Sequence, residues 1–109
     1  MSKILDDVKH QLGIVVADTA FDQTVQIHIN SVFAILNQLG VGPAMGFMLE
    51  TGDETWDEFF TDERLNAVKS YVYLRVKLLF DPPTTGFVLG SYERQIQELE
   101  FRLNAEVDF

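Results

Sequence analysis

The sequence contains no cysteine, so it forms no disulfide and offers no thiolate for catalysis or metal binding. It also has no apolar run of the roughly 18 residues that a membrane-spanning helix requires. The opening residues, MSKILDDVK, place two aspartates where a secretory signal peptide carries its apolar region, so no signal peptide is expected. At 109 residues the chain is long enough to fold as one soluble domain without covalent or metal cross-links.

Basic residues are scarce: 8 lysines and arginines stand against 17 aspartates and glutamates, which gives a net charge of −9. Proteins that bind DNA or RNA through phosphate neutralisation need a basic patch, so this balance argues against nucleic-acid binding of that kind. The acidic residues are also unevenly distributed. Between positions 50 and 63 there is no lysine or arginine, and the acidic residues are Glu50, Asp53, Glu54, Asp57, Glu58, Asp62 and Glu63.

Residues suited to catalysis or metal binding form no recognisable set. His10 and His28 are the only histidines, and neither has the spacing of a metal-ligand motif. A helix could bring Asp53 and Asp57 onto one face, but their spacing matches no calcium loop, and a solvated acidic face is the simpler interpretation. We therefore predict no catalytic, cofactor-binding or metal-binding residues.

Two short segments near the N-terminus have the spacing of amphipathic helices. The first is a helix that Ser2 could cap and that ends before Gly13; the second follows Thr19, which could form a capping box with Asp22, and ends before Gly40. Their apolar stripes are Ile4, Leu5, Val8 and Leu12 in the first, and Phe21, Val25, Ile29, Val32, Phe33, Leu36 and Leu39 in the second.

The stretch from Gly40 to Gly52 is the least regular part of the chain, because glycine and proline interrupt it repeatedly. It contains Gly-Phe-Met-Leu at 46–49, and a similar Gly-Phe-Val-Leu occurs at 86–89. Two such segments could pair as short strands, within one chain or between neighbours. A capping box at Thr55 and Glu58 then predicts a short helix that carries Trp56, Phe59 and Phe60.

A long helix is predicted from Thr61 or Asp62 to Phe80, where the sequence Asp81-Pro82-Pro83 ends it. This helix has two apolar faces, one with Leu65, Val68, Val72, Val76 and Leu79, and another with Tyr71, Leu74 and Leu78. One face fits the core of the subunit. The second fits either more of that core or a neighbouring molecule.

A last helix is predicted to begin at Ser91 and to bury Tyr92, Ile96, Leu99 and Leu103. The predicted fold is all-α, a bundle of four main helices with a short extra helix and a long irregular loop between the second and third main helices. Residues 1–103 would form the single helical domain. Residues 104–109 would form a projecting tail.

Too many large apolar side chains lie in the acidic region for so short a segment to bury alone, which favours a partner surface there. The predicted channel or partner surface consists of Phe47, Met48, Asp53, Glu54, Trp56, Asp57 and Glu58.

Several stretches together resemble the small head-tail connector (adaptor) proteins of tailed bacteriophages. They are INSVFAILNQLGVGP, the acidic Trp-Asp-Glu-Phe segment, VKSYVYLRVKLLFDPP and QIQELEFRLN, and the most specific part is Lys69 to Pro83. The resemblance covers nearly the whole chain.

The resemblance implies an all-helical adaptor without catalytic residues or cofactors, located in the virion neck and, during assembly, in the host cytoplasm. It implies a homo-oligomeric ring, expected to be a dodecamer, that docks under the portal protein, extends the DNA channel and joins the next head-completion or tail protein. Double-stranded DNA would pass without sequence-specific binding, and no membrane is involved. The second apolar face, Tyr71, Leu74 and Leu78, would form the subunit interface, and the tail residues Val107, Asp108 and Phe109 would dock on the portal.

Two other functions fit parts of the same composition. A small acidic protein could mimic DNA and inhibit a DNA-binding enzyme, although such mimics spread their acidic residues over a face instead of concentrating them in one segment. An enzyme could use the carboxylate cluster with a metal ion, a hypothesis that calorimetric titration with Mg²⁺, Ca²⁺ and Mn²⁺ would test.

Overall fold

The computed structural model describes residues 3–61 and 63–107, and for residues 105–107 it describes the backbone alone. Within these residues the chain forms helices and no strand, which confirms the predicted all-α class. The helices are α1 (Ile4–Gln11), α2 (Asp22–Gln38), the short α3 (Trp56–Phe59), α4 (Leu65–Phe80) and α5 (Gly86–Val107).

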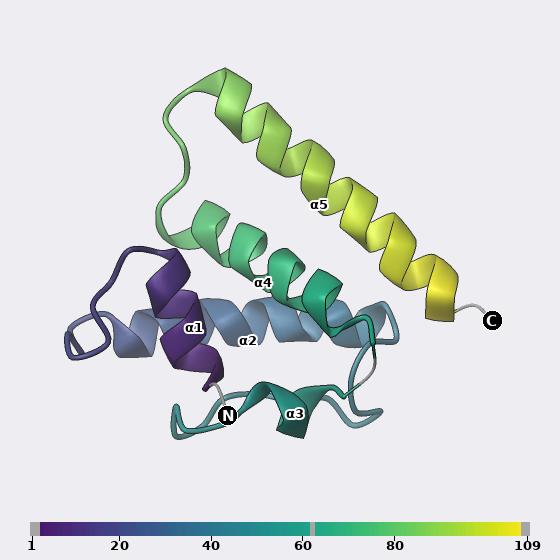
Figure 1. Cartoon of the computed structure of the whole chain (residues 1–109), viewed down its shortest axis with the longest axis horizontal. Coiled ribbons are helices and arrows are strands. Elements are labelled where there is room, and N and C mark those ends of the chain that lie inside the picture. Colours follow the sequence, from purple (N-terminus) through teal and green to yellow (C-terminus); the bar gives the residue numbers. More distant parts are fainter. Residues whose placement is uncertain (1–2, 62, 108–109) are drawn as a thin grey trace.

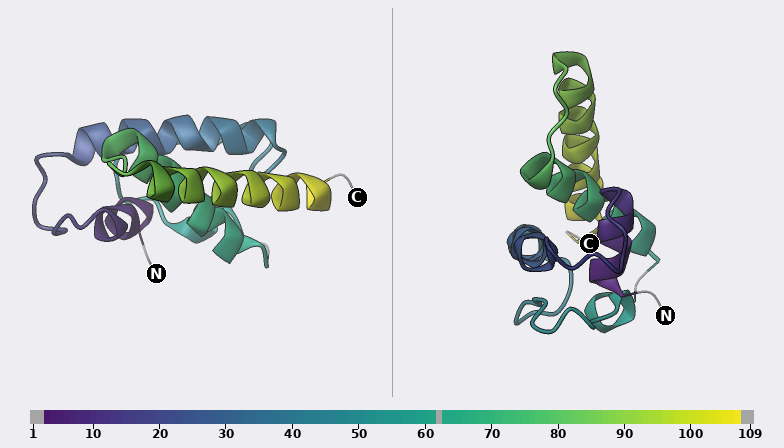
Figure 2. Two further views of the ribbon diagram at one scale, coloured as in Figure 1. Left: turned by 90° about the horizontal axis from the view of Figure 1, so that it is seen from above. Right: turned by 90° about the vertical axis from the view of Figure 1, so that its left-hand side faces the viewer.

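The centre of the fold is the contact between α2 and α4, which α1 covers at one end (Figure 1). The last helix, α5, packs chiefly against α4 and extends along one edge of the molecule (Figures 1 and 2). The loop after α2 and helix α3 run along the opposite edge. The molecule is flat, with extents of 42 × 35 × 20 Å. Its core includes Ile4, Val8, Val25, Ile29, Val32, Phe33, Leu36, Trp56, Phe59, Val68, Tyr71, Val72, Val76, Ile96 and Leu103.

Several helix ends follow the local signals in the sequence. Gly13 and Gly40 have φ angles of +79° and +84°, the left-handed conformation that glycine adopts most easily after a helix. The capping box of Thr55 and Glu58 begins α3, and α4 ends at Phe80 before the two prolines. These predicted boundaries are confirmed.

Three predicted starts are wrong. Helix α2 begins at Asp22 without a side-chain cap from Thr19. Helix α4 begins at Leu65, later than the predicted start at Thr61 or Asp62. Asp62 itself lies outside the described residues. Helix α5 begins at Gly86 and not at Ser91, because a helical turn forms directly after the proline turn. The Thr85 hydroxyl accepts a hydrogen bond of 3.4 Å from the Val88 N–H at this new start.

The early start of α5 also excludes the predicted strand pairing, because residues 86–89 form its first helical turn. At its other end α5 continues to Val107, so the predicted tail from residue 104 is helical as far as the structure describes it. Asp108 and Phe109 lie outside the described residues.

The irregular loop between α2 and α3 is tied to the helices through its backbone. The side-chain amide of Asn30 on α2 donates to the Leu49 carbonyl at 3.1 Å and accepts from the Leu49 N–H at 2.6 Å. The Ile4 N–H donates to the Glu54 carbonyl at 3.0 Å. At Gly42, φ is +93°, and an added Cβ would lie 2.6 Å from the ring of Phe59, so only glycine fits this close approach.

The α1–α2 loop is fixed by a buried lysine. The side chain of Lys9 is 1% exposed, and its ammonium donates to the carbonyls of Val16 and Asp18 at 2.8 and 2.7 Å. Asp22 at the start of α2 supplies the opposite charge at 2.7 Å. A buried ammonium needs this many partners to offset its lost hydration, so Lys9 locks the loop to both helices.

Candidate functional site

The predicted partner surface between Phe47 and Glu58 contains residues with different roles in the structure. Trp56 is 3% exposed, and its indole N–H donates to the Asp7 carboxylate at 2.7 Å. Its ring lies edge-on to Tyr73, with centroids 6.0 Å apart. Trp56 therefore belongs to the core of the subunit, and its predicted place on a partner surface is wrong.

Phe47 and Met48 are adjacent in sequence but lie in different environments. The ring of Phe47 packs against Phe33 and Phe59, with centroids 5.7 and 5.4 Å away, and is partly buried. The side chain of Met48 is 57% exposed and remains available to a partner.

Two of the four acidic residues stabilise the loop instead of facing a partner. The Glu54 carboxylate accepts N–H groups from Glu50, Thr51 and Gly52 at 2.8 to 3.1 Å. Glu58 accepts the N–H and the hydroxyl of Thr55 at 3.2 and 3.1 Å in the capping box.

The hydrogen bonds to Glu54 change its acidity. Burial alone would raise the pKa of this carboxyl, but the backbone N–H groups around it outweigh burial and hold its pKa at about 2. Glu54 is therefore ionised at all ordinary pH values, and its charge is used within the loop.

Asp53, Asp57 and Glu58 are the exposed acidic residues of the predicted set, and of these Glu58 is already engaged in the capping box. Asp53 forms an ion pair of 3.0 Å with Lys3, while Asp57 points into solvent from the first turn of α3. No group of three or more side chains suited to holding a metal ion occurs among residues 3–61 and 63–107. In the same part of the chain, no helix combines the length and the apolarity needed to cross a membrane.

The second apolar face of α4 is covered largely by α5. Tyr71 is completely buried, and its hydroxyl donates to Glu100 of α5 at 2.6 Å. Arg75 donates to the same Glu100 oxygen at 2.6 Å and to the Tyr71 hydroxyl at 3.1 Å. The predicted position of Tyr71 on an outward face is therefore wrong, because this face holds α5 in place.

The groups of this cluster have altered pKa values for physical reasons. Burial, reinforced by the hydrogen bond to Glu100, raises the pKa of Tyr71 to about 12. Burial acts to raise the pKa of Glu100 as well, but the hydrogen bonds from Tyr71 and Arg75 outweigh it and lower that pKa. The cluster thus contains a neutral phenol and an ion pair at neutral pH.

Leu74 and Leu78 lie partly buried on either side of the α4–α5 contact. Leu78 lines a groove of about 480 Å³ together with Leu89 and Ile96 of α5, and Leu74 lines a smaller hollow beside Leu99. Their contact with a neighbouring copy stays a prediction. The same holds for Val107, Asp108 and Phe109 as a docking tail, of which only the Val107 backbone is described.

The sequence reasoning missed an exposed apolar face on α5. The side chains of Phe87 and Phe101 are 84% and 75% exposed, and fourteen positions place them on nearly the same side of the helix, about 21 Å apart. Ile96, nine positions after Phe87, lies about two and a half turns away and faces the core. Phe101 could have been found from this periodicity, whereas Phe87 was assigned to a strand.

Phe47 and Met48 of the predicted partner surface border a hollow between α2 and the loop that follows it, together with Met45, which the prediction did not include. This hollow of about 480 Å³ has the rings of Phe33 and Phe47 in its lining and Met45 and Met48 beside them. Met45 is 99% exposed. Exposed methionines adapt readily to apolar partners, so this hollow is a candidate docking surface.

Comparison with protein families matches residues 4–109 to the family described as phage connector protein. The chain belongs to this phage connector protein family. Searches of curated proteins and of solved structures gave no significant match.

The family assigns the protein a structural role as a phage head-tail connector, located at the virion neck. Its candidate functional site is therefore a set of contact surfaces. The exposed surfaces described above are the outward face of α5, the hollow between α2 and its loop, and the acidic residues Asp53 and Asp57.

Proposed function

We propose that the connector assembles into a homo-oligomeric ring, a dodecamer, that docks under the portal protein and extends the DNA channel. The ring would join the head to the tail or to the next head-completion protein. The observation that carries this proposal is the family match over residues 4–109, which spans every described helix.

The shape and the surface of the subunit support assembly into a ring. The subunit is 20 Å thick and has exposed apolar side chains on α5 and on the loop after α2. These two segments run along opposite edges of the molecule (Figure 1). A head-to-tail contact between two different surfaces closes into a ring when the rotation between copies allows it. Leu74 and Leu78 are further candidates for this interface where α5 leaves them accessible.

The charge of the connector suits passage of DNA without binding. Asp53 and Asp57 are exposed in a segment without basic residues, and the whole chain carries a net charge of −9. An acidic channel wall repels phosphates at short range and so prevents DNA from adhering to it. We assign Asp53 and Asp57 to this wall and Met48 to a partner contact.

We assign the C-terminal residues Val107, Asp108 and Phe109 to the portal contact. The described C-terminal end of α5 lies away from α1 and α3, where a neighbouring protein can reach it (Figure 1). Subunits would be present in the host cytoplasm until they join the assembling neck.

Electron microscopy of the purified protein, alone and mixed with the portal protein of the same phage, tests the proposal. We expect rings in at least one of the two samples, and in the mixture they should cap the portal. Particles that stay monomeric in both samples would contradict it. Capture of a nuclease or repressor in place of portal protein would support the DNA-mimic alternative.

A further inference from the structure

Two exposed apolar surfaces of the connector are left uncovered by residues 3–61 and 63–107, the part of the chain that the structure describes. One is the outward face of α5, with Phe87 and Phe101. The other is the hollow between α2 and the loop, with Met45 and Met48. Ile27 on α2 is 58% exposed and lies on the same helical face as Ala34, which extends this second surface along the helix.

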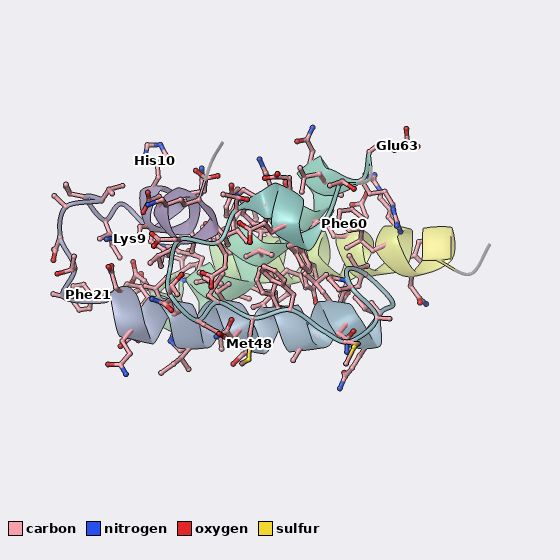
Figure 3. The ribbon with its side chains drawn as sticks, turned by 90° about the horizontal axis from the view of Figure 1, so that it is seen from below. Lys9, His10, Phe21, Met48, Phe60 and Glu63 are labelled. Atoms are coloured by element: carbon pink, nitrogen blue, oxygen red, sulfur yellow. The ribbon has the colours of Figure 1, made fainter. Side chains whose placement is uncertain are left out.

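The two surfaces face different directions. Helix α5 runs along one edge of the molecule, and the loop that carries Met45 and Met48 runs along the opposite edge (Figure 1). Seen from below, Met48 lies beside α2, while α5 passes behind (Figure 3). One subunit therefore cannot cover its own hollow with its own α5.

The hollow has a shape and chemistry that suit an aromatic side chain. Partly buried Phe47 borders the hollow over the buried Phe33, and Met45 and Met48 can contact an inserted ring through their sulfur atoms. The hydrogen bonds between Asn30 and Leu49 hold the loop at a fixed distance from α2. The site is therefore formed before a partner arrives, which lowers the entropic cost of docking.

The charges beside the two surfaces are complementary. Arg94 lies between Phe87 and Phe101 on the exposed side of α5, seven positions from each. Glu98 on the same side is neutralised by its ion pair with Arg102, which leaves Arg94 as the net charge of this face. Glu50 lies at the hollow and is exposed. If α5 packed against α5 of a second copy, the two Arg94 side chains would face each other and repel. If one hollow packed against another, the two Glu50 side chains would do so. A contact of α5 with the hollow pairs opposite charges instead.

We propose that the outward face of α5 docks into the α2–loop hollow of a second copy of the same chain, with Phe87 or Phe101 in the hollow. This inference rests on the proposed ring and names the two surfaces that join its subunits. Because the two surfaces differ, each copy keeps one of each free for the next neighbour, and the contact propagates around the ring.

Cysteine cross-linking tests the pairing directly, because the native chain contains no cysteine. Three single variants are prepared: Met45→Cys, Phe87→Cys and Phe101→Cys. They are mixed two at a time in the presence of the portal protein of the same phage, and one variant of each pair carries a tag that makes it larger, so that mixed dimers can be recognised by size. After mild oxidation, Met45→Cys should form a disulfide with Phe87→Cys or with Phe101→Cys. Each variant alone should give only background, since a surface that contacts a different surface does not meet itself.

Val15→Cys is the matched control, because Val15 is an apolar side chain that is 71% exposed in the α1–α2 loop, outside both surfaces. Its yield with Met45→Cys measures collisions, and we expect the specific pair to exceed it by about tenfold or more. The substitution Phe101→Asp lies at an exposed position and should not disturb folding. It should raise the protein concentration at which half of the subunits are assembled by roughly tenfold or more.

The outcomes separate this inference from the proposed function. Rings that form while every cysteine pair stays at the Val15 background would overturn the pairing and leave the connector role intact. Disulfides of Met45→Cys with itself would also overturn it, in favour of a two-fold contact. Absence of rings both alone and with portal would overturn the proposed function, and the pairing with it.

Discussion

Glu54 shows how one ionised side chain can stabilise an otherwise irregular loop. The chain between Leu49 and Trp56 has no helix or strand to satisfy its backbone N–H groups, and the Glu54 carboxylate accepts three of them. Hydrogen bonds to a carboxylate are stronger than those between neutral groups. The loop therefore keeps its shape without regular secondary structure, and Met48 is held next to α2.

The first prediction concerns Glu54→Gln. The pKa of Glu54 is about 2 in the folded protein and about 4.5 without these contacts, so its contribution to stability is complete above pH 4.5 and is lost as the pH falls towards 2. After allowance for solvent screening, we expect the substitution to lower the free energy of unfolding by about 1–2 kcal/mol at pH 7. Urea unfolding at pH 7 and pH 3 measures this difference, which should shrink at the lower pH.

Asp57→Asn is the control for Glu54→Gln, because it removes a nearby exposed charge that accepts none of these loop N–H groups. It should change stability by less than about 0.5 kcal/mol. Equal losses in the two variants would mean that general charge, and not the hydrogen bonds of Glu54, stabilises the loop.

At the scale of the helices, α5 is attached chiefly through one neighbour. It packs against α4 through Ile96 and Leu103, which belong to the common core, and Glu100 links it to Tyr71 and Arg75. Helices α1, α2 and α4 each pack against two or more other helices, whereas α5 depends mainly on α4. Its docking should therefore respond to changes on a single face.

The second prediction compares Leu103→Ala with Phe101→Ala on α5. Leu103 is 1% exposed, so its truncation should cost about 2–4 kcal/mol and increase hydrogen exchange in α5 more than in α1 or α2. Phe101 is 75% exposed, and its truncation should leave both stability and exchange nearly unchanged. Native-state hydrogen exchange with mass spectrometry distinguishes the two, and uniform destabilisation of all helices by Leu103→Ala would show that α5 unfolds only with the whole molecule.

Sequence reasoning predicted the helices where local chemistry decides the result. Some signals act within a few residues: a glycine or a proline after a helix ends it, and a capping box begins one. The helix boundaries at Gly40, Pro82 and Thr55 could therefore be predicted without tertiary information. The start of α5 could not, because residues 86–89 favour a strand by composition and contain a glycine. In the structure these residues form the first turn of α5, where Leu89 lines the groove beside Leu78 of α4.

The contact surfaces were harder to predict than the helices for a physical reason. Aromatic content near residues 47–60 indicated a partner surface, but whether Trp56 faces outward depends on the position of α1, which supplies Asp7 to the indole. The same applies to Tyr71, whose environment is made by α5. Exposure is a property of the assembled fold, and spacing along one helix does not determine it.

For the whole molecule, the four acidic residues of the predicted surface divide into two that hold the loop and α3 together and two that do not. Glu54 and Glu58 are committed to hydrogen bonds within the loop and α3, so they are unsuitable for testing the role of surface charge. Asp53 and Asp57 can be neutralised without loss of such bonds, apart from the exposed ion pair of Asp53 with Lys3, which contributes little to stability. This division makes the proposed channel wall testable.

The last prediction therefore concerns the double variant Asp53→Asn/Asp57→Asn in the virion. It should fold and assemble normally, but weaker repulsion of phosphates should slow the release of DNA, on the order of tenfold at low salt. Dye fluorescence on DNA leaving purified particles measures the rate. The difference in release rate from wild type should narrow as added salt screens the charges.

The matched control is Asp81→Asn/Glu93→Gln, which removes the same number of exposed charges near α5 and should release DNA at the wild-type rate. Equal slowing in both variants would mean that net charge matters and not its position, and unchanged release in the first would place Asp53 and Asp57 away from the channel.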